Sequence, residues 1–202
     1  MTERLIEVRS CSITDAKCDV VVNPSNERAR LGGGVSRALF DACGGAVLQE
    51  AMDRAMEANF PDGFLELGRC IVTTAGTSRK MHHIIHVPAV DYRARRKLLP
   101  DGSVDATVTS PERIRVCTGV AAAAAADVAC LVQSPVSLAL PLMGVGAGGV
   151  APHVACEAMI AGLKGGLAPL SDVSSFFYTV VVAVPEPERH ALVSRLFASA
   201  FE

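Results

Sequence analysis

Short apolar runs alternate with longer amphipathic segments along most of the chain. The runs are rich in Val, Ile and Leu, as expected of strands buried on both faces of a sheet. They predict strands at residues 5–9, 19–23, 69–74, 82–87, 137–142 and 179–184. Apolar residues spaced three and four apart predict helices at residues 35–43, 46–58, 111–132, 152–164 and 186–201. This alternation indicates an α/β domain with three α/β/α layers.

The segment 19–35 joins a predicted strand to a predicted helix through a loop of amides and glycines. Asn23 and Asn26 stand at the carboxyl end of the strand, and the glycine triplet 32–34 directly precedes Val35. Glycines let a ligand approach backbone N–H groups, and the helix start adds the positive end of its dipole. We therefore expect an anion here, with the two asparagines bonding a sugar. The simpler alternative is a tight turn capped by asparagine.

A second glycine-rich loop follows the strand predicted at residues 137–142. It contains Gly144, Gly146, Gly148 and Gly149 just before another predicted helix, which is again a place for backbone amides to meet an anion. If the two strands are neighbours, both loops line one cleft, which suits a pyrophosphate held between two sugars. A Rossmann site is the competitor, but its glycine turn should follow the first strand directly and be followed by an acidic ribose ligand.

Three segments also carry a resemblance to a known family. The most specific is residues 19–26 with the loop at 32–35, similar to an Asp-Ala-Ile-Val-Asn-Ala-Ala-Asn segment and its glycine loop. The second is residues 68–75 with 82–87, similar to paired strands that end in Val-Ile-His-x-Val. The third is residues 140–150, similar to a second phosphate loop. Together they resemble the macro domains, which bind ADP-ribose and in many members hydrolyse ADP-ribose derivatives.

The resemblance implies a single macro domain over residues 1–202, with three α/β/α layers around a central mixed, mostly parallel sheet. It implies a cleft that binds ADP-ribose or ADP-ribosylated protein and uses neither cofactor nor metal. Asn26 would contact the distal ribose and is the candidate catalytic residue. The residues that the resemblance places against the ligand are Ser12, Ile13, Asn23, Asn26, Gly32, Gly33, Gly34, Val35, Gly144, Val145, Gly146, Ala147, Gly148, Gly149 and Val150.

The chain departs from the family pattern at three places. Ser12 replaces an aspartate that commonly bonds the adenine amino group, so weaker or less selective adenine recognition is expected. The segment 147–149 lacks an aromatic residue often present there, which would remove one stacking wall for a ribose. Ser36 stands where one hydrolytic branch carries an aspartate, and no replacement general base is evident.

The departure at Ser36 leaves two functions open. Other family members hydrolyse with help from the substrate's own phosphate, an ordered water and the asparagine, so loss of the acid does not exclude turnover. The chain is therefore expected to bind ADP-ribose, either as a hydrolase of ADP-ribosyl modifications on protein or a related metabolite, or as a non-catalytic reader or sensor of ADP-ribose.

Composition narrows the classes of partner. The 202 residues are 50% hydrophobic, enough to bury a sizeable core, and the formal net charge of −2 gives no electrostatic footprint for nucleic acid. Prolines and glycines interrupt the low-charge stretch 131–150, and residues 1–4 precede no apolar signal region, so neither a membrane partner nor secretion is expected. Seven cysteines without a C-x-x-C pair predict buried free thiols and a cytoplasmic location.

Two further clusters invite a functional interpretation. His82, His83 and His86 suggest zinc at first sight, but alternation along a strand puts His83 on the opposite face from the other two. Core packing is the favoured role, and no metal is expected. The basic segment 93–97 lies within the longest irregular stretch, 88–110, where a solvated loop is favoured over a phosphate or partner contact.

Overall fold

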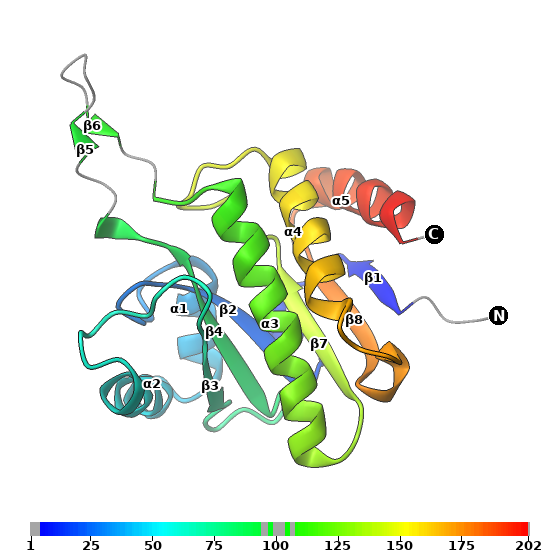
Figure 1. Cartoon of the computed structure of the whole chain (residues 1–202). Helices are drawn as coiled ribbons and strands as arrows, with labels where there is room; N and C mark the ends of the chain where they lie inside the picture. Colours follow the sequence, from blue (N-terminus) through cyan, green and yellow to red (C-terminus); the bar gives the residue numbers. More distant parts are fainter. Residues whose placement is uncertain (1–4, 94–96, 99–103, 106–107, 202) are drawn as a thin grey trace.

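The chain forms a six-stranded sheet covered by helices on both faces (Figure 1). The computed structural model describes residues 5–93, 97–98, 104–105 and 108–201. All pairings in this sheet are parallel except that of β3 with β4, which is antiparallel. In spatial order the strands are β1 (Ile6–Arg9), β8 (Phe177–Ala183), β7 (Val136–Pro141), β2 (Val20–Asn26), β4 (His83–Val90) and β3 (Ile71–Thr74). The predicted mixed, mostly parallel sheet is therefore confirmed.

The helices lie close to where the apolar spacing predicts them. The helices are α1 (Gly34–Ala42), α2 (Ala46–Asn59), α3 (Pro111–Val132), α4 (Pro152–Leu167) and α5 (Pro187–Ala200), with short 3-10 turns η1 (Ile13–Asp15) and η3 (Val173–Ser175).

A small two-stranded sheet, β5 (Lys97–Leu98) with β6 (Val104–Asp105), was not predicted and stands outside the main sheet (Figure 1).

Strand alternation divides the core into two layers. Val20 and Val22 of β2 pack on the side of α3 and α4, while Val21 faces the side of α1 and α2. The two helix layers thus bury opposite faces of the same strands, as three-layer α/β/α packing requires.

Helices α3 and α4 approach each other closely because glycines lie at their contact. A Cβ on Gly162 would come within 2.4 Å of the Arg115 carbonyl oxygen, and a Cβ on Gly166 within 2.5 Å of that of Gly119. By length and composition, α3 is the one helix within the described ranges that could cross a membrane. Its many buried alanines, packed against α4 and the sheet, are those of a core helix.

The cysteines and histidines are only partly where the sequence places them. All seven cysteines are free thiols, but Cys130 is exposed, and Cys11 and Cys70 are half-buried. His86 is buried in β4, as expected of a core histidine. His82 precedes β4, so the strand alternation assumed for it does not apply, and its exposed ring lies 3.5 Å from the Asp19 carboxylate.

Candidate functional site

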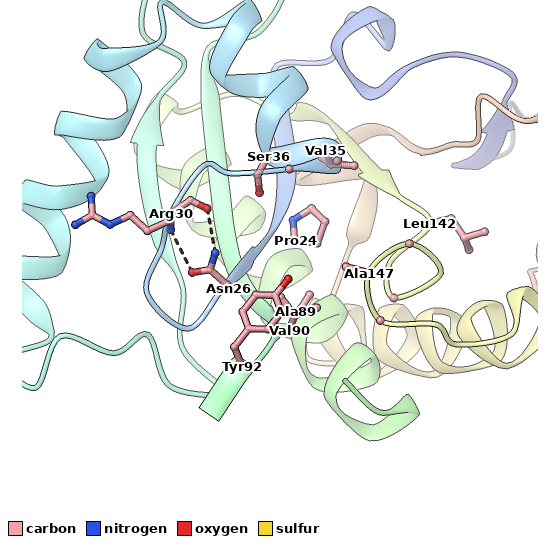
Figure 2. Close-up of a pocket in the computed structure, with 15 residues that line it drawn as sticks. Pro24, Asn26, Arg30, Val35, Ser36, Ala89, Val90, Tyr92, Leu142 and Ala147 are labelled. Atoms are coloured by element: carbon pink, nitrogen blue, oxygen red, sulfur yellow. Dashed lines mark hydrogen bonds between the residues drawn. The ribbon is translucent and has the colours of Figure 1, made fainter. Parts of the chain in front are cut away.

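A cavity of about 250 Å³ opens at the carboxyl edge of the sheet (Figure 2). Strands β2 and β7 are parallel neighbours, so the loops that follow them meet at this edge, as the sequence predicts for neighbouring strands. The end of β4 supplies a third wall. The lining residues are Pro24, Asn26, Arg30, Gly33, Gly34, Val35, Ser36, Ala89, Val90, Tyr92, Leu142, Gly144, Gly146, Ala147 and Gly148.

The first glycine loop leads directly into α1 with free backbone donors. Gly33 is the N-cap residue and makes no side-chain capping bond, so the first N–H groups of the helix have no side-chain acceptor. Gly34 has φ of +54°, a left-handed conformation that favours glycine. Gly33 has extended backbone, with φ of −156°, and an added Cβ would meet nothing within 4 Å. The fold therefore requires glycine at Gly34 but not at Gly33.

The second glycine loop is held much more tightly by its surroundings. A Cβ on Gly144 would come within 2.4 Å of Ile114 Cδ1, and one on Gly148 within 2.4 Å of Thr109 Cγ2. The Val150 amide donates to the Gly144 carbonyl oxygen at 3.0 Å and closes the loop. Gly146 differs from these, because a Cβ there would meet nothing within 4 Å.

Asn26 lines the cavity and also fixes the shape of the loop after β2. Its Oδ1 accepts from the backbone N–H groups of Arg28 at 2.9 Å and Arg30 at 3.3 Å. Its Nδ2 donates to the Arg30 carbonyl oxygen at 3.1 Å, and Figure 2 shows these bonds to Arg30. The turn-capping role that the sequence left open is therefore realised, and direct ligand contact by Asn26 stays a prediction.

Asn23 lies behind the cavity wall rather than on it. Its side chain is fully buried, and its Oδ1 accepts from Ser36 Oγ at 2.8 Å. Its Nδ2 lies 3.0 Å from His86 Nδ1. Both ends of the Asn23 side chain thus have partners within the protein, and the direct sugar contact expected for Asn23 stays a prediction. Successive residues of a strand point to opposite faces of the sheet. Asn23 therefore shares the face of Val21 and is covered by α1.

Other predicted site residues lie outside the lining of the cavity. Among the described residues, its lining does not include Ser12, Ile13, Gly32, Val145, Gly149 or Val150. Ser12 caps η1, where its Oγ accepts from the Thr14 amide at 3.4 Å, and Ile13 is buried in the core. Since η1 packs against α1 and β7, Ser12 lies at the same edge of the sheet as the cavity. The predicted adenine contact of Ser12 stays a prediction.

Several lining residues were not predicted from the sequence. Tyr92 follows β4 and is 40% exposed, so it brings an aromatic surface to the cavity from a segment interpreted as irregular loop. In the sequence, Ser36 stands out only as a departure from the family pattern. A lone tyrosine just after an apolar run was the one signal available for Tyr92. The remaining unpredicted lining residues are Pro24, Arg30, Ala89, Val90 and Leu142.

Ion pairs consolidate the rim beside the cavity. Arg30 Nη1 lies 3.1 Å from Asp53 Oδ1. The buried Asp91 pairs with Arg93 at 2.9 Å and with Arg113 at 3.2 Å, and the hydrogen bonds from Arg93 hold the pKa of Asp91 below its usual range.

The basic segment is only partly described. Arg93 also pairs with Glu66 and lies over the Phe64 ring at 4.5 Å, so it is committed to holding this loop. Residues 94–96 and the side chain of Lys97, which carry the rest of the predicted basic segment, lie outside the described part of the chain.

The described residues contain no group of three His, Cys, Asp or Glu side chains that could hold a metal ion. The described lining of the cavity also contains no carboxylate and no imidazole. Its polar groups are instead backbone amides, the Asn26 amide, the hydroxyls of Ser36 and Tyr92, and the Arg30 guanidinium. This set can bind an anion and sugar hydroxyls, but it offers no side chain suited to general-base work at neutral pH.

Comparison with known proteins agrees with this geometry. The family model described as Macro domain matches residues 22–159. An uncharacterized protein of Aquifex aeolicus is 34% identical over 155 residues, which cover 77% of this chain and 78% of that protein. Another uncharacterized protein, from Aeropyrum pernix, is 29% identical over 160 residues, 79% of this chain and 71% of that protein.

Solved structures of macrodomains share the fold at low sequence identity. A mutant of the Oceanobacillus iheyensis macrodomain with ADPR has a TM-score of 0.72 at 20% identity and covers 96% of this chain and 92% of that one. The Trypanosoma brucei macrodomain in complex with ADP-ribose has a TM-score of 0.68 at 18% identity, with coverage of 96% and 69%.

Proposed function

The chain belongs to the macro domain family, and from that premise we propose that its cavity binds ADP-ribose, free or attached to protein. The pyrophosphate would lie between the two glycine loops, against the unpaired N–H groups at the start of α1. The distal ribose would lie beside Asn26 and Ser36. Tyr92 would supply an aromatic surface for a sugar or base, in place of the aromatic residue that the second loop lacks.

One observation carries this proposal. Gly33 and Gly146 both line the cavity, one from each loop, and neither is required by the packing of the fold, since a Cβ on either would meet nothing within 4 Å. Neither has the positive φ that would favour glycine. A pyrophosphate that contacts the backbone amides directly requires open space at both loops. The packing of the fold does not by itself require that space.

The comparisons support the ligand as well as the fold. The structures of two related macrodomains are described as complexes with ADP-ribose, and those same two proteins are also described with ADP. Both ligands contain a pyrophosphate, which is the group that the two loops are suited to hold.

The geometry favours binding over hydrolysis by a side-chain base. Because no carboxylate or imidazole occurs in the described lining, any hydrolysis would have to take its base from the substrate's phosphate and its water from the region of Asn26. We therefore propose a binding module first, with substrate-assisted hydrolysis as the second candidate function.

Calorimetric titration with ADP-ribose and with AMP tests the binding proposal. ADP-ribose should bind more tightly, because AMP lacks the distal phosphate and ribose, and equal affinities would overturn the assignment. A turnover assay on mono-ADP-ribosylated protein, run beside Asn26→Ala, separates the two functions. Turnover that Asn26→Ala abolishes supports the hydrolase, whereas binding of the modified protein without turnover supports the reader.

A further inference from the structure

A chain of hydrogen bonds runs from the cavity wall into the core of the sheet. Ser36 Oγ, on α1, donates to Asn23 Oδ1, on β2, at 2.8 Å. Asn23 Nδ2 lies 3.0 Å from Nδ1 of His86, on β4, and His86 Nε2 lies 2.9 Å from Oγ1 of Thr73, on β3. All four side chains are buried, and of the four only Ser36 lines the cavity. The chain therefore links the ligand cavity to three strands of the sheet.

The middle of this chain has a defined direction. An amide nitrogen is only a donor, so His86 Nδ1 must accept from Asn23 Nδ2. Burial lowers the pKa of His86 to about 3, so the ring is neutral at physiological pH and carries one proton. That proton must lie on Nε2, from which it is donated to Thr73 Oγ1.

The start of α1 favours this direction over its reverse. Ser36 lies in the first turn of the helix, where unpaired N–H groups form the positive end of the helix dipole. The amide oxygen of Asn23 points toward this turn, whereas a reversed amide would bring its positive NH₂ group there. Thr73 at the other end can either donate or accept, so it does not oppose the choice.

We propose that Ser36 is a ligand-orienting residue whose hydroxyl oxygen acts only as an acceptor toward the cavity, because its single proton is committed to Asn23. Such an oxygen selects a partner that can give a proton, which is a sugar hydroxyl or a water. It disfavours a phosphate oxygen, which has no proton to give. Asn23 and His86 are positioning residues that maintain this polarity. The inference rests on the proposed function and places the distal ribose, rather than a phosphate, beside Ser36.

The tautomer of His86 tests the direction of the chain without any ligand. Nitrogen NMR of the ring in the wild-type protein should find the proton on Nε2. Ser36→Asp replaces a donor with a carboxylate that has only acceptors, so Asn23 should turn its Nδ2 toward it and its Oδ1 toward His86. The ring proton should then move to Nδ1. Ser36→Ala is the matched control and should keep the wild-type tautomer, since the helix end is unchanged.

Two spectra can overturn the direction. A proton on Nδ1 in the wild-type protein would mean that Asn23 donates to Ser36 and leaves its hydroxyl free to donate. A proton that stays on Nε2 in Ser36→Asp would mean that the residue at this position does not control the chain. If Ser36→Asp does not fold, the wild-type and Ser36→Ala spectra still decide the direction.

Calorimetry tests what the acceptor recognises. Ser36→Ala should weaken ADP-ribose binding about three- to tenfold, the usual effect of losing one neutral hydrogen bond, and should leave AMP binding unchanged. Equal losses for the two ligands would place Ser36 against the shared AMP part and overturn the ribose assignment. A wild-type protein that binds no ADP-ribose would instead overturn the proposed function, whereas the tautomer would still report the direction of the chain.

Discussion

The two glycine loops look alike in the sequence and differ in what they need glycine for. In the second loop, Gly144 and Gly148 are required by the fold, because a side chain on either would collide with Ile114 or Thr109. In the first loop, Gly33 has ordinary extended backbone and open space around its Cα. A glycine in such a motif can therefore serve folding at one position and ligand approach at another. Substitutions at Gly144 or Gly148 should therefore damage stability, whereas a substitution at Gly33 should damage binding.

The largest effect is expected at Gly33. Gly33→Glu should reduce ADP-ribose affinity at least about 100-fold, because the carboxylate would occupy the space of the pyrophosphate and repel its charge. The free energy of unfolding should change by less than about 1 kcal/mol, since a Cβ added at this position meets nothing within 4 Å. Calorimetry and denaturant unfolding of the same variant measure the two quantities.

Gly165→Glu is the matched control for that experiment. It makes the same change in net charge on the exposed surface of α4, where a Cβ also meets nothing within 4 Å. Its ADP-ribose affinity should equal that of the wild type. Unaltered affinity in a folded Gly33→Glu variant would refute the phosphate-binding role of the first loop.

A smaller effect, on stability this time, is expected at Gly148. Gly148→Ala should lower the free energy of unfolding by about 1–3 kcal/mol, the usual cost of overpacking, because the new methyl group would also lie 2.5 Å from the Gly144 carbonyl oxygen. Gly146→Ala, two residues earlier, should stay within about 0.5 kcal/mol of the wild type. Equal stabilities of the two variants in denaturant unfolding would show that the fold does not require glycine at Gly148.

Outside the loops, a substitution of Ser12 should strengthen ADP-ribose binding rather than weaken it. Ser12→Asp should tighten ADP-ribose binding about tenfold, because a carboxylate accepting from the adenine amino group makes a charge-assisted bond. The gain should be selective for the base, since an inosine analogue presents a carbonyl oxygen that the carboxylate would repel. If calorimetry finds the same ratio of affinities for the two ligands in both proteins, Ser12 does not face the base.

The smallest effect is expected at Tyr92. Tyr92→Leu should weaken ADP-ribose binding about three- to fivefold through loss of aromatic stacking, while Tyr92→Phe should retain most of the affinity. The backbone N–H of this residue donates to Glu27 Oε2 at 3.0 Å, a bond that neither substitution removes. Equal affinities of the Leu and Phe variants would show that no ring packs on the ligand at this wall.

Much of this architecture could be predicted from local patterns. The apolar runs predicted the strands of the main sheet, and the helical spacing predicted the helices that cover it. The order of strand, glycine loop and helix indicated the two loops that line the cavity. The extension of β4 to Val90 could not be predicted, because Pro88 argues locally against a strand. It is tolerated since β3 pairs with β4 only from His83 to His86, which leaves Pro88 without a described neighbour on that side.

The individual residues of the site are harder to predict from the sequence than the strands and loops that carry them. Asn23 and Asn26 look equivalent in the sequence, but strand alternation turns Asn23 toward α1 and Asn26 toward the cavity. Tyr92 reaches the cavity only because β4 extends further than its sequence suggests. The proposed role of Ser36 also depends on a distant segment, because its partner Asn23 is bonded in turn to the buried His86. Contacts between distant segments carry this information, and local periodicity does not.

The position of ADP-ribose in a soaked crystal of the wild-type protein tests directly whether the two glycine loops hold the pyrophosphate. We expect the pyrophosphate between Gly33 and Gly146, with its oxygens within hydrogen-bond distance of the first N–H groups of α1, and the distal ribose beside Ser36 and Asn26. Density for the pyrophosphate away from both loops would overturn the proposed binding mode, and so would a phosphate oxygen in contact with Ser36 Oγ.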